Sequence, residues 1–81
     1  MNIYRHVFAA VCPADGEMIG YQLEIRSVSM IHVEHIKAET ALMKTGWHEK
    51  IGDHLSDTIG GDQTIPATHQ GVEIETLRHS G

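Results

Sequence analysis

The residue of this chain best suited to covalent chemistry is its single cysteine, Cys12. It follows the strand-type run FAAV and precedes Pro13, so we expect it where a strand gives way to an exposed loop. A thiolate in such a place is a nucleophile when neighbouring donors or a positive charge lower its pKa. The alternative is that Cys12 is a small buried hydrophobic residue, as most lone cysteines of intracellular proteins are.

His48 and Glu49 form a second candidate pair, placed where a helix is predicted to begin. The histidine titrates near neutral pH and can carry a proton to or from a reacting group. The glutamate can accept two hydrogen bonds from N–H groups on the edge of a ring. Glu34, at the start of the preceding helix, is a similar candidate for a substrate contact. Both glutamates also suit a helix N-terminus that binds nothing, because the helix dipole favours negative charge there.

Seven histidines in 81 residues raise the alternative of a metal-binding protein. The side chains that the two predicted helices could offer to an ion are those of His32, His35, His48, His54 and Glu49. An H-E-x-x-H motif is absent, because Gly52 occupies the position four after His48. Most of the histidines also have the polar neighbours of solvated surface residues, so our main interpretation includes no metal ligands.

The N-terminal third of the chain predicts a β-hairpin that would carry Cys12. Residues 3–11 are rich in β-branched and aromatic residues, and the segment PADGE after Cys12 supplies the residues of a turn. Residues 19–27 follow with the period-two alternation of a half-buried antiparallel strand. The apolar positions of that alternation are Ile19, Tyr21, Leu23 and Ile25.

Two helices are predicted next, because apolar residues begin to recur every third or fourth position. The first apolar stripe consists of Val33, Ile36, Thr40 and Met43, and the second of Trp47, Ile51, Leu55 and Ile59. We expect Ser27 or Ser29 to cap the first helix and Gly46 to end it. Gly60 and Gly61 are expected to close the second helix, since glycine tolerates a positive φ.

The last segment, residues 64–78, predicts a second hairpin. A short extended run weakened by Pro66 leads to a turn near residues 69–71. The strand after this turn has Val72, Ile74 and Thr76 on one face and Glu73 and Glu75 on the other. The order of hairpin, two helices and hairpin predicts a single antiparallel α+β domain over residues 1–81, abbreviated ββααββ.

Length and charge limit what this domain can do. A chain of 81 residues buries only a little over ~60% of its unfolded surface, and one cysteine forms no internal disulfide, so we expect stabilisation by homo-oligomerisation.

The charge of the chain limits its ligands. With 6 Lys+Arg against 11 Asp+Glu the formal net charge is -5, which favours a small neutral molecule over free nucleic acid as a general ligand. No apolar run approaches the ~18 residues of a membrane span, so the sequence indicates a soluble, cytoplasmic chain that contacts no membrane.

The ββααββ order, with Val-Cys-Pro at the end of the first strand, resembles the tunnelling fold (T-fold). Within that fold it resembles the 7-cyano-7-deazaguanine (preQ0) reductases and the related QueF-like amidinotransferases. The segments that carry the resemblance are VCPADG, MIHVEHIK, WHEKIGDHL and GVEIET. Each motif is short, so the specificity comes from their order and spacing. The resemblance implies T-fold subunits that assemble into a homo-oligomeric barrel.

The resemblance also implies a covalent mechanism. Cys12 would attack the nitrile carbon of 7-cyano-7-deazaguanine and form a thioimide, which a second reagent then reduces or displaces. His48 would carry a proton, Glu49 would anchor the purine-like base, and Glu34 would support it. The base would lie at a subunit boundary, with Cys12 from one chain and Glu49 from the same or the neighbouring chain.

Departures from the family pattern limit which of its residue roles and cofactors can be assigned to this chain. The family has an aspartate a few residues beyond its cysteine, whereas the counted position here is Ile19, so Asp15 or Glu17 would have to take its place. The stretch that binds the nicotinamide cofactor NADPH in the reductases is reduced to Glu34 and Lys37. The shorter first helix is closer to compact relatives that form an amidine on a base already installed in a nucleic acid.

The sequence therefore predicts a nitrile-acting enzyme of 7-deazaguanine metabolism, by reduction or by amidine formation. Its substrate would be the free base or the base within a nucleic acid such as tRNA. The alternatives are a non-catalytic T-fold module for binding or interaction and a histidine-based metal-binding protein. NADPH would be needed only for reduction.

Overall fold

The structure, a computed structural model, describes residues 1–80 and has the strands and helices in the predicted order. Their bounds are β1 (Asn2–Val11), β2 (Met18–Ser27), α1 (Val33–Leu42), α2 (His48–Ile59), β3 (Asp62–His69) and β4 (Val72–Arg78). Neither described helix is long and apolar enough to cross a membrane. The ββααββ order and the antiparallel α+β class are confirmed, while the predicted domain end at residue 81 lies outside the described residues.

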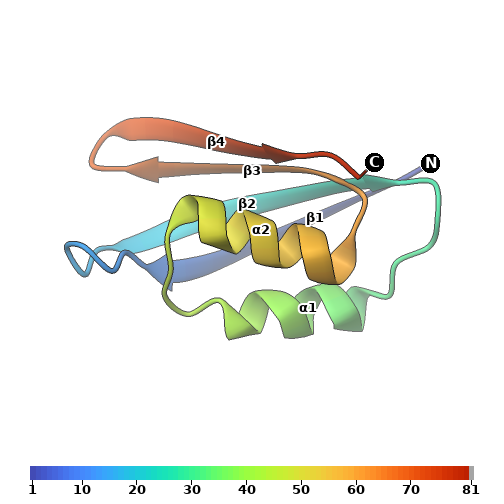
Figure 1. The fold of residues 1–81 in the computed structure, drawn as a ribbon, viewed down its shortest axis with the longest axis horizontal. Coiled ribbons are helices and arrows are strands. Elements are labelled where there is room, and N and C mark those ends of the chain that lie inside the picture. The colour runs from blue at the N-terminus through green and yellow to red at the C-terminus, as the bar shows by residue number, and fades with distance from the viewer. Residues whose placement is uncertain (81) are drawn as a thin grey trace.

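The strands form one antiparallel sheet in the order β1-β2-β3-β4, and both helices lie on the same face of it (Figure 1). β2 and β3 are neighbours in the sheet although the helix pair separates them in the sequence. As a result, both hairpin turns and the α1–α2 connection lie at one end of the molecule (Figure 1). We call this end, made of residues 12–17, 43–49 and 69–71, the turn end. The start of β1 and the end of β4 lie at the opposite end.

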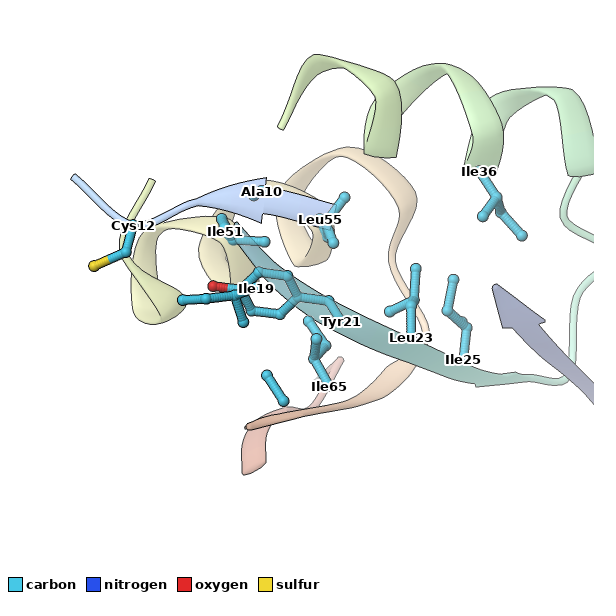
Figure 2. Packing of buried hydrophobic residues seen from close by; sticks show 11 residues of the cluster. Ala10, Cys12, Ile19, Tyr21, Leu23, Ile25, Ile36, Ile51, Leu55 and Ile65 are labelled. Atoms are coloured by element: carbon cyan, nitrogen blue, oxygen red, sulfur yellow. The ribbon is translucent and has the colours of Figure 1, made fainter. Parts of the chain in front are cut away.

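The predicted alternation in β2 produces the core of the domain. The β2 side chains that face the helices and are at most 2% exposed are Ile19, Tyr21, Leu23 and Ile25. The helices cover them with Ile51 and Leu55 from α2 and Ile36 from α1 (Figure 2). Val33, the first residue of the predicted α1 stripe, is instead 55% exposed. α2 is therefore the main cover of the sheet, and α1 lies at the edge of the core.

The first helix starts differently from the prediction. Its N-cap is His32, which makes no side-chain capping hydrogen bond, so neither Ser27 nor Ser29 caps it. The Ser27 hydroxyl instead accepts a hydrogen bond from the Ser29 N–H at 3.1 Å, which forms a local turn at the end of β2. The next segment is tied back to β1, because the Ile31 N–H donates to the Tyr4 hydroxyl at 2.9 Å. The helix therefore begins only after the chain has crossed from the sheet to the helix layer.

Pro66 does not prevent β3 from forming an interior strand. β3 is paired with β4 along its length from Gln63 to His69. Its ladder to β2 is interrupted beside Pro66, between the pairs Tyr21–Ala67 and Glu24–Thr64, as expected for a residue that has no N–H to donate. Pro66 therefore interrupts the pairing of β3 with β2 but not its pairing with β4.

Gly61, in the turn between α2 and β3, has no room for a side chain. Its φ is +75°, and a Cβ there would lie 2.8 Å from Ile25 Cγ2 and 3.0 Å from the Arg26 carbonyl oxygen. Gly71 has a similar φ of +78°, but nothing lies within 4 Å of its Cβ position. Both alanine variants should lose about 1 kcal/mol to the left-handed conformation. Gly61→Ala should lose about 1–3 kcal/mol more through overpacking; equal losses in urea unfolding would contradict the clash.

Candidate active site

Three reactive side chains meet at the turn end. Cys12 follows β1, Asp15 lies in the β1–β2 turn and His69 ends β3. The Cys12 Sγ, an Asp15 carboxylate oxygen and a His69 ring nitrogen all lie within 4.8 Å of one another. We call these three residues the Cys12 cluster. The β2–β3 register brings them together, because the pairing of Tyr21 with Ala67 places His69 beside the start of β2 and so beside the first turn.

Hydrogen bonds in the β1–β2 turn orient the Asp15 carboxylate towards the second hairpin. The Cys12 N–H donates to the Glu17 carbonyl oxygen at 2.8 Å, and the Glu17 N–H donates to Asp15 Oδ1 at 2.9 Å. The other carboxylate oxygen, Oδ2, accepts from His69 Nε2 at 2.9 Å and from Gln70 Nε2 at 2.6 Å. Asp15 therefore ties together two turns that are far apart in the sequence.

Asp15 is held in its ionised form. The Glu17 N–H, then the His69 and Gln70 side chains, and to a smaller degree Cys12, hold the pKa of its carboxyl well below the usual range by donating hydrogen bonds. Glu17 adds a second carboxylate, with its Oε2 3.2 Å from His69 Nε2. Both predicted substitutes for the family aspartate thus contact His69. An ionised Asp15 can orient the His69 ring, but it has no proton to give at neutral pH.

Buried polar atoms without a hydrogen-bond partner lie beside the Cys12 cluster. Within residues 1–80 they include Tyr21 Oη and both ring nitrogens of His48. The His48 ring centroid is 5.3 Å from that of Tyr21 and 5.9 Å from that of His69. A buried polar group without a partner costs about 1–3 kcal/mol, so these atoms are free to accept or donate hydrogen bonds to a water or a polar ligand. Tyr21, His48 and the Cys12 cluster together form the candidate site.

The end of β1 holds the start of α2 in this position. The Val11 N–H donates to the Lys44 carbonyl oxygen at 2.8 Å, and the Gly46 N–H donates to the Val11 carbonyl oxygen at 3.2 Å. His48 is the first residue of α2, and Glu49 lies in its first turn. Both members of the predicted pair therefore lie at the turn end, and Glu49 is exposed there.

Cys12 is only 4% exposed, so the expectation of an exposed nucleophile is wrong for the single chain. The β1–β2 turn folds back beside it, with the Gly16 N–H donating to the Cys12 carbonyl oxygen at 2.9 Å. Cys12 packs with the hydrophobic core, as the alternative interpretation expects. Its Sγ, however, lies at the outer end of the core and points away from the other side chains (Figure 2). A ligand would reach it from the side of Asp15 and His69, whose side chains are 31% and 17% exposed.

Glu34 does not join the other predicted residues within the chain. It lies in the first turn of α1, and α1 begins at the end of the molecule opposite the turn end (Figure 1). The helices run in opposite directions, so only one of their N-termini can lie beside Cys12. That N-terminus belongs to α2. Within a single chain Glu34 therefore lies away from Cys12, and its contact with a ligand at a subunit boundary stays a prediction.

The histidines of the alternative metal-binding interpretation are not brought together within the described chain. His32 is the N-cap of α1, and His35 Nε2 donates to the Thr58 carbonyl oxygen at 2.7 Å. Thr58 follows His48 by three helical turns, or about 15 Å along the axis at 1.5 Å per residue, so His35 and His48 do not share an ion. His54 instead donates to a carboxylate of α1 at 2.9 Å.

His69 is the candidate residue that the sequence analysis missed. In the sequence it is one of seven histidines and lies in a segment predicted to turn. No local pattern connects it with Asp15, because the two residues are 54 positions apart. The feature that could have located it is its place at the second hairpin turn, which must lie beside the first turn once β2 and β3 are neighbours.

His48 should make the stability of the fold depend on pH. Burial, and then the charge of nearby His69, lower the pKa of His48 from its ordinary value of 6.5. Below pH 6.5 His48 binds a proton in the unfolded chain but stays neutral in the folded chain, because its folded pKa is lower. The free energy of unfolding should therefore fall as the pH drops from 6.5 towards the folded pKa.

Replacing His48 by glutamine should flatten this part of the stability curve. Urea unfolding on either side of pH 6.5 would measure the slope for the wild-type chain, for His48→Gln and for the control His79→Gln. His79 is a suitable control because its side chain is 79% exposed. A slope that His48→Gln and His79→Gln change equally would show that His48 is not the group responsible.

Comparison of sequences identifies no relative, since no protein-family model and no curated protein matches the chain. Comparison of structures identifies a chain with a similar fold. A crystal structure of the archaeosine synthase QueF-Like in its apo form matches 99% of this chain and 92% of that chain. The TM-score is 0.74 and the sequence identity is 18%. The chain therefore has the same fold as that crystal structure.

The structural match confirms the predicted T-fold arrangement of strands and helices. Because it covers nearly the whole chain, it includes both hairpins and the turn end. At this sequence identity the likeness concerns the fold, so the roles of individual residues rest on the geometry of the candidate site.

Proposed function

We propose that this protein is an enzyme of 7-deazaguanine metabolism in which Cys12 forms a covalent thioimide with the nitrile carbon of 7-cyano-7-deazaguanine. The observation that carries the proposal is the candidate site. A thiol lies beside Asp15 and His69, next to buried polar atoms of Tyr21 and His48 that lack partners within residues 1–80. The fold shared with a protein named archaeosine synthase supports a 7-deazaguanine base as the substrate class.

The first step of the proposed reaction is an addition. The Cys12 thiolate attacks the nitrile carbon, a carbon–sulfur bond forms, and one carbon–nitrogen π bond breaks. The proton that leaves the thiol ends on the nitrile nitrogen, so the step needs no oxidant or reductant. His69 is the proton carrier that the geometry favours, because it belongs to the Cys12 cluster. Asp15 acts through His69 as a positioning residue, and neutral His48 is available to bind the ligand.

Glu49 is proposed to hold the base. Its exposed carboxylate lies at the turn end, where it can accept two N–H groups from a purine-like ring edge. Trp47, His48 and Lys50 line a shallow hollow with it. Trp47 is 52% exposed and offers a face on which a heteroaromatic base can stack. Glu34 would reach the same base only from a second copy of the chain.

We propose an amine as the second reagent. Hydride transfer would need NADPH, and the residues that match the cofactor-binding stretch of the reductases are limited to Glu34 and Lys37 on α1. An amine that attacks the thioimide carbon expels the Cys12 thiolate and leaves an amidine, with no oxidation or reduction. Both the free base and the base within a nucleic acid are substrates to test.

A non-catalytic T-fold binding module is the competing function. One observation favours it, because Cys12 is 4% exposed in the single chain. In that case the candidate site would bind the base without forming a bond to it. The two functions differ in one measurable property, which is whether the complex is covalent.

The test is to incubate the purified chain with 7-cyano-7-deazaguanine, free and within an oligonucleotide, and to record the intact protein mass. The proposed addition loses no atoms, so the mass should rise by the full mass of the ligand, with a change in absorbance from the conjugated thioimide. An unchanged mass together with measurable binding would favour the binding module. An unchanged mass without binding would overturn both functions.

We also propose that the chain works as a homo-oligomer. β1 and β4 are the edges of the described sheet, and Ile3, Val7 and Leu77 are exposed apolar side chains on those strands. Joining the edges of neighbouring copies would pair the free backbone groups of β1 and β4, and closing the barrel would enclose the sheet face that carries these side chains. Light scattering should give a mass well above 9.0 kDa that falls on dilution together with ligand binding. A stable 9.0 kDa species that still binds the ligand would contradict this assembly.

A further inference from the structure

The Cys12 cluster has the donor atoms of a transition-metal site. Zinc in proteins binds thiolate sulfur at about 2.3 Å and imidazole nitrogen or carboxylate oxygen at about 2.0–2.2 Å, so its tetrahedral ligand atoms lie about 3.3–3.8 Å apart. The sulfur, oxygen and nitrogen atoms of Cys12, Asp15 and His69 already lie within 4.8 Å of one another. Small side-chain rotations would bring them to an ion.

The charges around the cluster also favour a cation. Asp15 and Glu17 direct two carboxylates at one imidazole, with oxygens 2.9 Å and 3.2 Å from His69 Nε2. Within residues 1–80 neither carboxylate pairs with a lysine or an arginine. Ionisation of Cys12 would add a third negative charge beside them. A divalent ion would neutralise this charge at the point where the three groups converge.

An independent observation indicates an occupant of this place. The Tyr21 side chain is 2% exposed, and its hydroxyl has no partner within residues 1–80. In Figure 2 this hydroxyl points towards the end of the core where Cys12 lies. His48, whose ring is 5.9 Å from that of His69, has two buried and unpartnered nitrogens. A water on a metal ion would offer these atoms the partners that they lack.

We propose that Cys12, Asp15 and His69 bind a divalent ion of the zinc class, with a water as the fourth ligand. The inference does not rest on the nitrile chemistry. Binding displaces the thiol proton of Cys12 and leaves His69 as a neutral imidazole, so it releases protons to the solvent. The ion would use the same sulfur that attacks the nitrile. The metal-bound form should therefore not form the thioimide until a chelator removes the ion.

The experiment is a titration of the untagged, chelator-treated chain with Co²⁺, which replaces zinc and has visible absorption. One ion per chain should produce d–d bands and a thiolate-to-cobalt charge-transfer band in the near ultraviolet. Cys12→Ser should lose the charge-transfer band. His69→Gln should weaken the affinity by more than about 100-fold, since residues that only support metal ligands already contribute about 10–100-fold. The matched control His32→Gln, at the other end of the molecule, should change nothing.

A second measurement covers the case in which a variant fails to fold. Zn²⁺ should slow the alkylation of Cys12 by iodoacetamide in the wild-type chain, and a chelator should restore the rate. The inference is overturned if wild-type protein shows no charge-transfer band with Co²⁺, if the band survives in Cys12→Ser, or if His32→Gln weakens binding as much as His69→Gln. A cobalt spectrum without a nitrile adduct would refute the proposed function alone, and an adduct without a cobalt spectrum would refute this inference alone.

Discussion

Replacing Cys12 by alanine is expected to abolish the covalent adduct with 7-cyano-7-deazaguanine completely. Cys12 is the chain's only cysteine, so no other thiol can supply the sulfur of a thioimide. Non-covalent binding should change by less than about tenfold, or 1.4 kcal/mol, because Glu49 and the polar atoms of Tyr21 and His48 remain. Intact-mass measurement would record the adduct, and calorimetry would record the binding.

The matched control for this prediction is Cys12→Ser, which keeps a small polar side chain at the same position. Its hydroxyl is a weak nucleophile at neutral pH, so it should also form no adduct. Circular dichroism and urea unfolding would show that both variants are folded. An adduct that persists in Cys12→Ala would place the reaction at another residue and would overturn the role of the Cys12 cluster.

Replacing His69 by glutamine is expected to slow formation of the adduct by about 10²–10⁴-fold, the usual contribution of a general acid or base. Glutamine keeps a hydrogen-bond donor for Asp15 but cannot carry the proton from the thiol to the nitrile nitrogen. Asp15→Asn should have a smaller effect, since it removes the charge that orients the ring. The rate would be followed by the absorbance of the thioimide as a function of pH, and His69→Gln should flatten that profile.

Gln70→Ala is the control that separates proton transfer from a structural role. Gln70 donates to the same Asp15 oxygen at 2.6 Å, but it does not titrate. Its removal should slow the reaction by less than about tenfold, or 1.4 kcal/mol. If Gln70→Ala and His69→Gln slow the reaction equally and leave the pH profile unchanged, His69 is structural. If His48→Gln alone changes the profile, then His48 is the proton carrier.

The elements of this fold follow from local patterns in the sequence. The alternation from Ile19 to Ile25 predicts β2 and the side that it buries, and the four-residue repeat predicts α2, although Trp47, the first residue of that repeat, lies just before the helix and is 52% exposed. These predictions succeed because the period of the apolar residues must match the geometry of the element that buries them. The same periodicity places His48 and Glu49 at the start of α2, and the Cys-Pro sequence places Cys12 at the end of β1.

The start of α1 and the exposure of Cys12 do not follow from local patterns. Ser27 and Ser29 have the chemistry of a cap, but the chain must first cross from the sheet to the helix layer, so α1 begins beyond them. The cysteine has the position of a loop nucleophile, but the β1–β2 turn folds back beside it. In both places a long-range constraint on the path of the chain outweighs the local preference.

Which residues meet in the candidate site is decided only by the tertiary structure. Asp15 and His69 meet because the β2–β3 register places one hairpin turn beside the other, and that register depends on packing between segments separated by two helices. Within a single chain Glu34 lies away from Cys12 for the same kind of reason, since antiparallel helices place their N-termini at opposite ends (Figure 1). A sequence pattern reports which side of its own element a residue faces. Which residues of other elements it meets is decided only when the sheet and the helices pack together.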